Sequence, residues 1–453
     1  MTSPTAGPQR HEVLTEIEAL LSWNPPRLIH RIPESIKEPS TTTRAPAFYD
    51  KHFSSNLILE NIDRLPSLVQ DLARNVDTAL QAASNTLPPL DGFITVQQRA
   101  AVRRSLPTKV TSEAGVVEIY LQTTARYCMP LASTLALHPT ASFSQWSSLL
   151  FWTVPSDYGI TDGVLRFIDE GDDDDDDDIK TLRAAIVKSM ESENRRFFEK
   201  MRDSMRPLAT WEMKTISTGS LEVMAAVRTP GKFAWTYCDA SHCDLNSRYR
   251  DERDKVALVK VGPDAQTPPW SFPVQTSLDP ENRDEEIDIS PPLIEPSQRP
   301  DTPQATSSAA ASGPSMQPPP PPSALKYVSP TKGSKKRKLG DDDEAYKDRH
   351  NLTAQSLVLQ AWAQAVRVDG TVIILHSGNY ELVCLRHRNS QTLYVSDLIE
   401  PPTCANPGYG KLQVGIYIAA IQDAMDRHKQ QSTMSPKSPG GGDFIGGDKS
   451  RDD

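Results

Sequence analysis

Residues 208–217, LATWEMKTIS, are the stretch on which the fold prediction depends. Apolar and polar residues alternate through it, which is typical of a strand buried on one face. Side chains two residues apart leave a strand on the same face, so Glu212 and Lys214 should point together, with Trp211 and Met213 on the other face. An acid and a base held side by side in this way indicate either a solvated charge pair or half of a functional site.

The composition predicts a folded core interrupted by disorder. The 453 residues suffice for two or three domains, but nearly half of the 38 prolines lie between Pro263 and Pro330. The formal net charge of -10 argues against bulk attraction to a polyanion, so contact with nucleic acid would need a local basic patch or a metal. Five scattered cysteines, no signal sequence and no long apolar run predict a protein of a reducing compartment that is not secreted and contacts no membrane.

Hydrophobic periodicity and composition divide the chain into five parts. Periods near 3.6 predict helices over 10–22 and 56–84, in a helical N-terminal region with flexible connections. A core in two pieces follows, with a disordered Pro/Ser-rich insertion and a disordered tail. The predicted bounds are 1–105 for the helical region, 106–261 and 351–429 for the core, 262–350 for the insertion and 430–453 for the tail.

Within the core, the pattern predicts helices and strands in a definite order. A helix capped by Thr111 or Ser112 comes first, then two short strands around the turn PSDYG and a helix over 179–203. The strand 208–217 follows. Beyond the insertion, a helix ends at Gly370, and a hairpin, a further strand and a last helix over 410–428 complete the core.

Carboxylates on neighbouring strands suit divalent-metal chemistry. Mg²⁺ is held by one or two carboxylates together with waters and substrate phosphate, so Asp162 and Glu212 would suffice as ligands. The metal would polarise a phosphodiester and help to generate hydroxide, and the ammonium of Lys214 would orient water or offset charge in the transition state.

In order and motif, these elements resemble the PD-(D/E)XK nuclease superfamily. The resemblance implies an α/β fold with a restriction-endonuclease-like mixed sheet flanked by helices, and hydrolysis of nucleic acid with Mg²⁺ or Mn²⁺. The first acid of the motif falls on Asp162 in GITDGVLRF, and its acid and lysine fall on Glu212 and Lys214 in WEMK. The implied metal ligands are Asp162 and Glu212.

The same resemblance suggests two further site residues. Related enzymes often use a glutamine of the following helix, here Gln360 or Gln364 in SLVLQAWAQAV, and a helix acid, for which Glu118 in VVEIYLQ is the candidate. The alternative for Glu118 is an exposed helix acid. As a whole, the chain also resembles lineage-expanded proteins of mushroom-forming fungi, which implies little chemistry.

The chain departs from the superfamily pattern around its first acid. Thr161 stands where a proline is expected, the two acids are about fifty residues apart, and a longer insertion separates the second strand from its helix. Asp157 in PSDYG is therefore a rival first acid. The alternative function is a catalytically inactive nuclear adaptor or binding protein that keeps the fold.

Three further sequence features are separate from the candidate site of Asp162, Glu212 and Lys214. The basic cluster Lys335, Lys336, Arg337 and Lys338 is typical of a nuclear localisation signal, which predicts an import receptor as partner and a nuclear rather than cytoplasmic location. The segment CDASHCD has no second ligand pair at zinc-finger spacing, so a zinc site is disfavoured there. The acidic run that ends at Asp178 is predicted to be a solvated loop.

Overall fold

The computed structural model describes residues 7–31, 53, 55–83, 87, 109–139, 148–154, 162–168, 177–204, 206–236, 262–266, 269–273 and 341–434. The rival acid Asp157, the CDASHCD segment and the basic cluster 335–338 lie outside these ranges. Met1–Phe272 and Asp343–Asp453 form one compact unit.

The centre of the unit is an eight-stranded mixed sheet. Its strands, in spatial order, are β4 (Leu150–Thr153), β5 (Gly163–Phe167), β6 (Ala209–Met213), β8 (Val372–His376), β9 (Glu381–His387), β10 (Thr392–Val395), β2 (Asn61–Arg64) and β7 (Gly231–Lys232). The pairs β6–β8 and β10–β2 are parallel and the other neighbours are antiparallel. A separate two-stranded sheet joins β1 (Ile29–His30) to β3 (Lys109–Val110).

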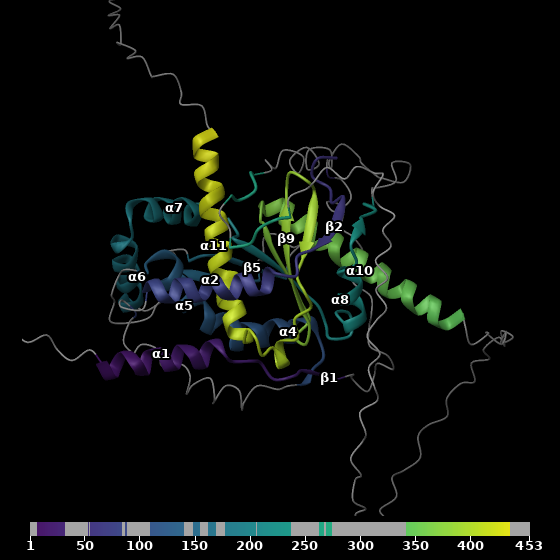
Figure 1. Cartoon of the computed structure of the whole chain (residues 1–453), viewed down its shortest axis with the longest axis horizontal. Coiled ribbons are helices and arrows are strands. Elements are labelled where there is room, and N and C mark those ends of the chain that lie inside the picture. Colours follow the sequence, from purple (N-terminus) through teal and green to yellow (C-terminus); the bar gives the residue numbers. More distant parts are fainter. Residues whose placement is uncertain are drawn as a thin grey trace, which may run out of the picture. The chain divides into compact units, whose positions relative to one another are not determined.

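Helices cover both faces of the large sheet, which confirms the predicted mixed α/β class (Figure 1). One hydrophobic cluster joins one face to a layer of helices, and a second cluster joins the other face to α8 (Leu221–Val227) and α10 (Asp341–Val368). The first layer contains α1 (Gly7–Leu21), α2 (Leu68–Ala83), α5 (Arg126–Leu137), α6 (Asp177–Ser189), α7 (Ser192–Asp203) and α11 (Tyr409–Met434).

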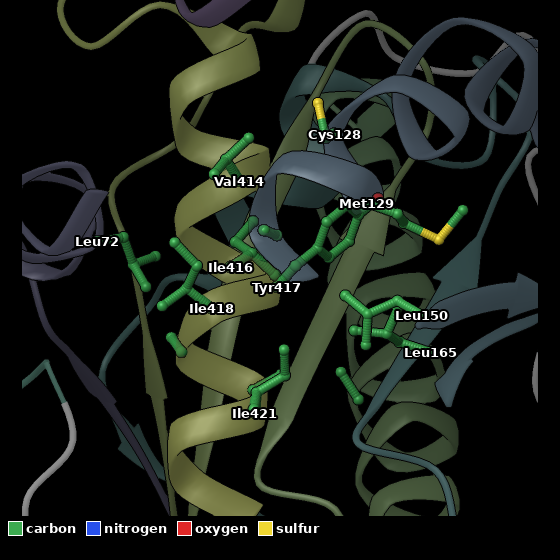
Figure 2. Close-up of a cluster of buried hydrophobic side chains, with 14 of the residues drawn as sticks. Leu72, Cys128, Met129, Leu150, Leu165, Val414, Ile416, Tyr417, Ile418 and Ile421 are labelled. Carbon is green, nitrogen blue, oxygen red and sulfur yellow. The ribbon is translucent and has the colours of Figure 1, made fainter. Parts of the chain in front are cut away.

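Helix α11 is the main support of the first layer. Its segment 414–421 is apolar almost all round, which is typical of a helix buried on every side. Figure 2 shows Tyr417 and Ile418 among side chains from α2, α5 and the sheet. At Gly415 the helix lies so close to α2 that an added Cβ atom would stand 2.6 Å from the carbonyl oxygen of Leu72. The glycine therefore permits the close helix packing.

The N-terminal region is not a separate helical region. The predicted helix over 56–84 is wrong in its first part, because 61–64 form strand β2, and confirmed in its second part, where α2 spans Leu68–Ala83. Ile62 pairs with Leu393 in parallel register, and Pro66 disfavours helical backbone at the residue before it. The sheet therefore takes up a segment whose periodicity alone indicates a helix.

Several boundaries also differ from those predicted. The segment 179–203 forms two helices, α6 and α7, instead of one. Residues 262–266 and 269–272, assigned from sequence to the disordered insertion, contact the core: Trp270 is buried, and Asp264 accepts the backbone amides of Arg388 (2.6 Å) and Asn389 (3.0 Å). Helix α10 begins at Asp341, ten residues ahead of the predicted restart of the core.

Helix α10 ends at the predicted place, but the residue that turns the chain is Asp369 rather than Gly370. Asp369 has the left-handed φ of 54°, its amide bonds to the carbonyl of Val366, and the amide of Gly370 bonds to that of Ala365 at 2.8 Å. This is a Schellman arrangement. It directs the chain straight into β8, which is the parallel neighbour of β6.

Candidate functional site: a buried lysine–carboxylate cluster

Glu212 and Lys214 lie together at the C-terminal end of β6, as the alternation predicts. Their exposed fractions are 1% and 4%, and Lys214 Nζ lies 2.5 Å from Glu212 Oε1. Trp211 and Met213 face the first hydrophobic cluster on the opposite side. The alternative of a solvated pair is wrong, because neither charge is in water.

Two further acids reach the same ammonium. Asp162 Oδ2 lies 3.4 Å from Lys214 Nζ, and Glu113 Oε2 lies 3.6 Å from it. Asp162 immediately precedes β5 and also accepts the backbone amide of Met213 at 2.9 Å, so the pairing of β5 with β6 fixes its position. Three carboxylates from distant parts of the chain thus surround one lysine.

The glutamine that contacts this cluster is Gln364. Its Nε2 donates to Glu212 Oε2 from helix α10. Gln360, the other candidate, is buried one turn earlier on the same helix. Both oxygens of Glu212 therefore accept a hydrogen bond, Oε1 from Lys214 and Oε2 from Gln364.

The helix acid at the site is Glu113 and not Glu118. Glu118 is exposed and accepts a hydrogen bond from Gln122 at 3.0 Å. Helix α4 (Glu113–Tyr120) starts after Ser112, one of the two predicted N-cap residues. The Oγ of Ser112 accepts a hydrogen bond from the backbone amide of Gly115. Five residues correspond to about 140° around a helix, so Glu113 and Glu118 face different directions. In the sequence, the position of Glu113 directly after the N-cap Ser112 was the feature that could have identified it.

Burial and mutual charge shift the pKa values of the cluster. Burial raises the pKa of Glu212 to about 7, with Lys214 opposing this rise and Asp162 adding to it. Burial likewise raises the pKa of Glu113 to about 7. Burial disfavours the charged form of Lys214, but the carboxylates of Glu212, Asp162 and Glu113 outweigh it and raise the lysine pKa above its ordinary value. Lys214 is therefore an ammonium donor near neutral pH, and the two glutamates can exchange protons there.

Whether the cluster can bind a divalent ion depends on the position of the Lys214 ammonium. Asp162 is one-quarter exposed and could ligate an ion, but Glu212 could do so through Oε1 only if the ammonium moved away. Among the described residues, no three His, Cys, Asp or Glu side chains form a metal-binding group. The donor set thus suits a two-carboxylate Mg²⁺ site, completed by water and substrate, and only with Lys214 displaced.

A second polar cluster, which was not predicted from the sequence, lies on the other face of the sheet. Glu381 is fully buried and accepts hydrogen bonds from Tyr409 Oη (2.7 Å), Gln413 Nε2 (2.7 Å) and His376 Nδ1 (2.8 Å). The carbonyl of His376 accepts the amide of Lys214 at 2.8 Å. The cluster thereby connects α11 to the strand end beside Lys214. Its sequence signal is one polar residue at the end of β8, His376, and one at the start of β9, Glu381.

Comparison with other proteins gives no further assignment. No helix in the described part of the chain is long and apolar enough to cross a membrane. The chain matches no known family model, no curated protein and no solved structure.

Proposed function

We propose that the chain is a Mg²⁺-dependent nuclease whose site contains Asp162, Glu212 and Lys214. The observation that carries this proposal is the convergence of two acids, from the start of β5 and the end of β6, on one cation, the ammonium of Lys214. Carboxylates that share an ammonium are placed to share a divalent ion of the same charge sign.

The chain's own residues would have separate tasks in phosphodiester hydrolysis. Asp162 and Glu212 would hold Mg²⁺ or Mn²⁺, and the bound metal would supply Lewis-acid polarisation of the phosphate. Lys214, freed from Glu212, would keep its proton and offset negative charge on the phosphate. Gln364 would orient Glu212 through Oε2. Glu113, whose side chain is about two-fifths exposed beside Lys214, would accept a proton at the open side of the cluster.

The order of elements supports the same proposal. Helix α4, the strand that follows Asp162, the strand with Glu212 and Lys214, helix α10 and the strands β8 and β9 follow one another as the PD-(D/E)XK resemblance implies. The restriction-endonuclease-like arrangement is thus part of the proposal.

The complete hydrogen bonding of Glu212 and Lys214 within the protein favours a second candidate function. Both oxygens of Glu212 are engaged and Lys214 also donates to the carbonyl of Met213 at 2.8 Å. A fully paired network of this kind can be a structural remnant, so the second candidate is a catalytically inactive nuclease-fold adaptor.

A cleavage assay separates the two functions. Purified full-length protein would be incubated with labelled DNA and RNA, with Mg²⁺, Mn²⁺ or EDTA. We expect metal-dependent cleavage that Asp162→Asn and Lys214→Met each reduce by about 100-fold or more. Glu118→Gln, on the exposed side of α4, is the matched control and should cleave like the wild type.

Folding must be checked in the same experiment, because Lys214 is buried. Asp162 is partly exposed, so Asp162→Asn should keep the wild-type thermal unfolding transition. If the folded wild-type protein cleaves neither substrate, or if Asp162→Asn cleaves normally, the nuclease proposal fails and the adaptor remains.

A further inference from the structure

A cavity of about 80 Å³ lies at the end of β6 opposite Lys214. Its walls come from the end of α7, the link into β6, the end of α10 and the second half of α11. A single water needs roughly 10–15 Å³ of such space, so the cavity can hold a group of about five non-hydrogen atoms. Its ionisable lining residues are Lys200, Arg206, Asp369, Arg427 and His428. We call it the basic pocket.

Cations converge on the basic pocket from two elements. Lys200 of α7 places its Nζ 3.5 Å from Nδ1 of His428 on α11, and Arg206 lies close enough to act on the same imidazole. Burial, Lys200 and Arg206 lower the pKa of His428, so the ring is neutral at pH 7. Lys200 therefore donates to Nδ1, which leaves Nε2 as a further donor.

The acids around the basic pocket already have partners. Asp369 accepts from Arg386 Nη2 at 2.7 Å and Arg388 Nε at 3.1 Å, and Arg427 approaches it at 3.6 Å. Burial opposes the charged form of Asp369, but these three arginines lower its pKa below the ordinary value. Glu193, the other acid near His428, pairs with Lys429 at 3.0 Å.

Lys200 and Arg206 give the basic pocket positive charge that its acids do not neutralise. Neither forms an ion pair with an acid in the part of the chain that the structure describes. Both are exposed, whereas Arg427, which also lines the cavity, is buried and pairs with Asp423 at 2.9 Å. Like charges gathered around one cavity repel one another, and an anion inside the cavity would relieve that repulsion.

We propose that the basic pocket binds a phosphate-type oxyanion. A tetrahedral anion fits the volume, Lys200 and Arg206 would contact its oxygens as charged donors, and His428 Nε2 would add a neutral donor. The anion is either free phosphate, including phosphate monoesters, or a phosphodiester of nucleic acid. The proposal does not rest on the nuclease site, which lies at the other end of β6.

Calorimetric titration of the full-length protein tests the proposal. Inorganic phosphate is one probe, and a short oligonucleotide without terminal phosphates is the other, both at constant ionic strength. We expect saturable binding of at least one probe, weakened tenfold or more in Lys200→Ala/Arg206→Ala. The control Lys188→Ala/Lys232→Ala removes the same charge from exposed positions elsewhere and should bind like the wild type.

The outcomes are distinguishable from those of the nuclease assay. Binding of phosphate identifies free phosphate or a monoester as the source, and binding of the oligonucleotide alone identifies a nucleic-acid backbone. Asp162→Asn should retain the binding. If neither probe binds, or if both double variants lose binding equally, the basic pocket is an ordinary solvated surface and the proposal is overturned.

Discussion

Gln364 donates its side-chain amide to Oε2 of Glu212, 152 residues earlier in the chain. The bond joins α10 to β6 on the face of the sheet that α8 and α10 cover. A buried carboxylate needs such donors, since an unpaired buried charge is strongly unfavourable. The free energy of folding should therefore depend on this amide.

Gln364→Leu is expected to lower the free energy of unfolding by about 1–3 kcal/mol, because it leaves one oxygen of Glu212 buried without its donor. Urea unfolding followed by circular dichroism measures the change. Gln122→Leu is the matched control, since Gln122 donates to the exposed Glu118 and its loss should change stability by less than about 0.5 kcal/mol. Equal effects of the two variants would contradict the role of Gln364.

Lys214 and Glu212 should be strongly coupled. Lys214→Met removes a cation that contacts three carboxylates, and we expect the free energy of unfolding to fall by about 3–5 kcal/mol. In the double variant Glu212→Gln/Lys214→Met, the loss should be smaller than the sum of the two single losses. The four proteins are compared by urea unfolding. Additive losses would show that the pair contributes no coupling energy.

The raised pKa of Glu212 predicts a pH dependence of stability. A carboxyl whose pKa rises from 4.5 to about 7 on folding favours the folded state when protonated, so this stabilisation is full below pH 4.5 and lost as the pH rises to 7. The measurement is the stability of the wild type minus that of Glu212→Gln at several pH values. This difference should fall between pH 4.5 and 7.

The subtraction is needed because another group titrates in the opposite sense. Burial lowers the pKa of His138 to about 4, so its contribution is lost as the pH falls from 6.5 through 4. Both proteins contain His138, and its effect cancels in the difference. A difference that is constant or rises between pH 4.5 and 7 would show that Glu212 is ionised throughout that range.

Asp369 should contribute far more to the free energy of unfolding than an exposed acid with similar partners. Asp369→Asn leaves Arg386, Arg388 and Arg427 close together without their shared carboxylate, and we expect a loss of about 3–5 kcal/mol. Asp397→Asn is the control. Asp397 also pairs with two arginines but is about half exposed, so its loss should stay below about 1 kcal/mol. Thermal and urea unfolding of the two variants should therefore differ clearly.

The basic cluster at 335–338 predicts nuclear import. Replacing Lys335, Lys336, Arg337 and Lys338 with alanine should shift a fluorescently tagged full-length protein from the nucleus to the cytoplasm. The control replaces Lys437, Lys449 and Arg451 in the C-terminal tail. Unchanged nuclear accumulation of the first variant, measured as a fluorescence ratio in live cells, would remove the prediction.

Local patterns in the sequence were sufficient for much of the fold. Alternation placed Glu212 and Lys214 on one face, the cap at Ser112 started α4, and α10 ended beside Gly370, although the left-handed residue there is Asp369. Strand β2 could not be predicted in this way, because its conformation is set by pairing with β10, more than 300 residues later. A four-residue segment gains more from completing the ladder than from its own helical periodicity.

The candidate site was predictable in part for the same reason. Strand alternation predicts that Glu212 and Lys214 point together, whereas Asp162 was assigned from the resemblance, with Asp157 as its rival. The choice between Glu113 and Glu118 depends on how α4 is rotated against β6, and Glu381 depends on donors supplied by α11. Such rotations and cross-layer contacts are fixed by packing, which periodicity within one segment does not encode.

The parallel pairing of β6 with β8 bears on how the protein could be assembled. Ala209 pairs with Val372, so the two central strands come from opposite sides of the insertion, and β2 pairs with β10 across the same division. Strand pairing within the sheet holds the two parts together. Two co-expressed polypeptides divided between residues 274 and 340 should therefore complement each other and recover the intact fold as a split protein.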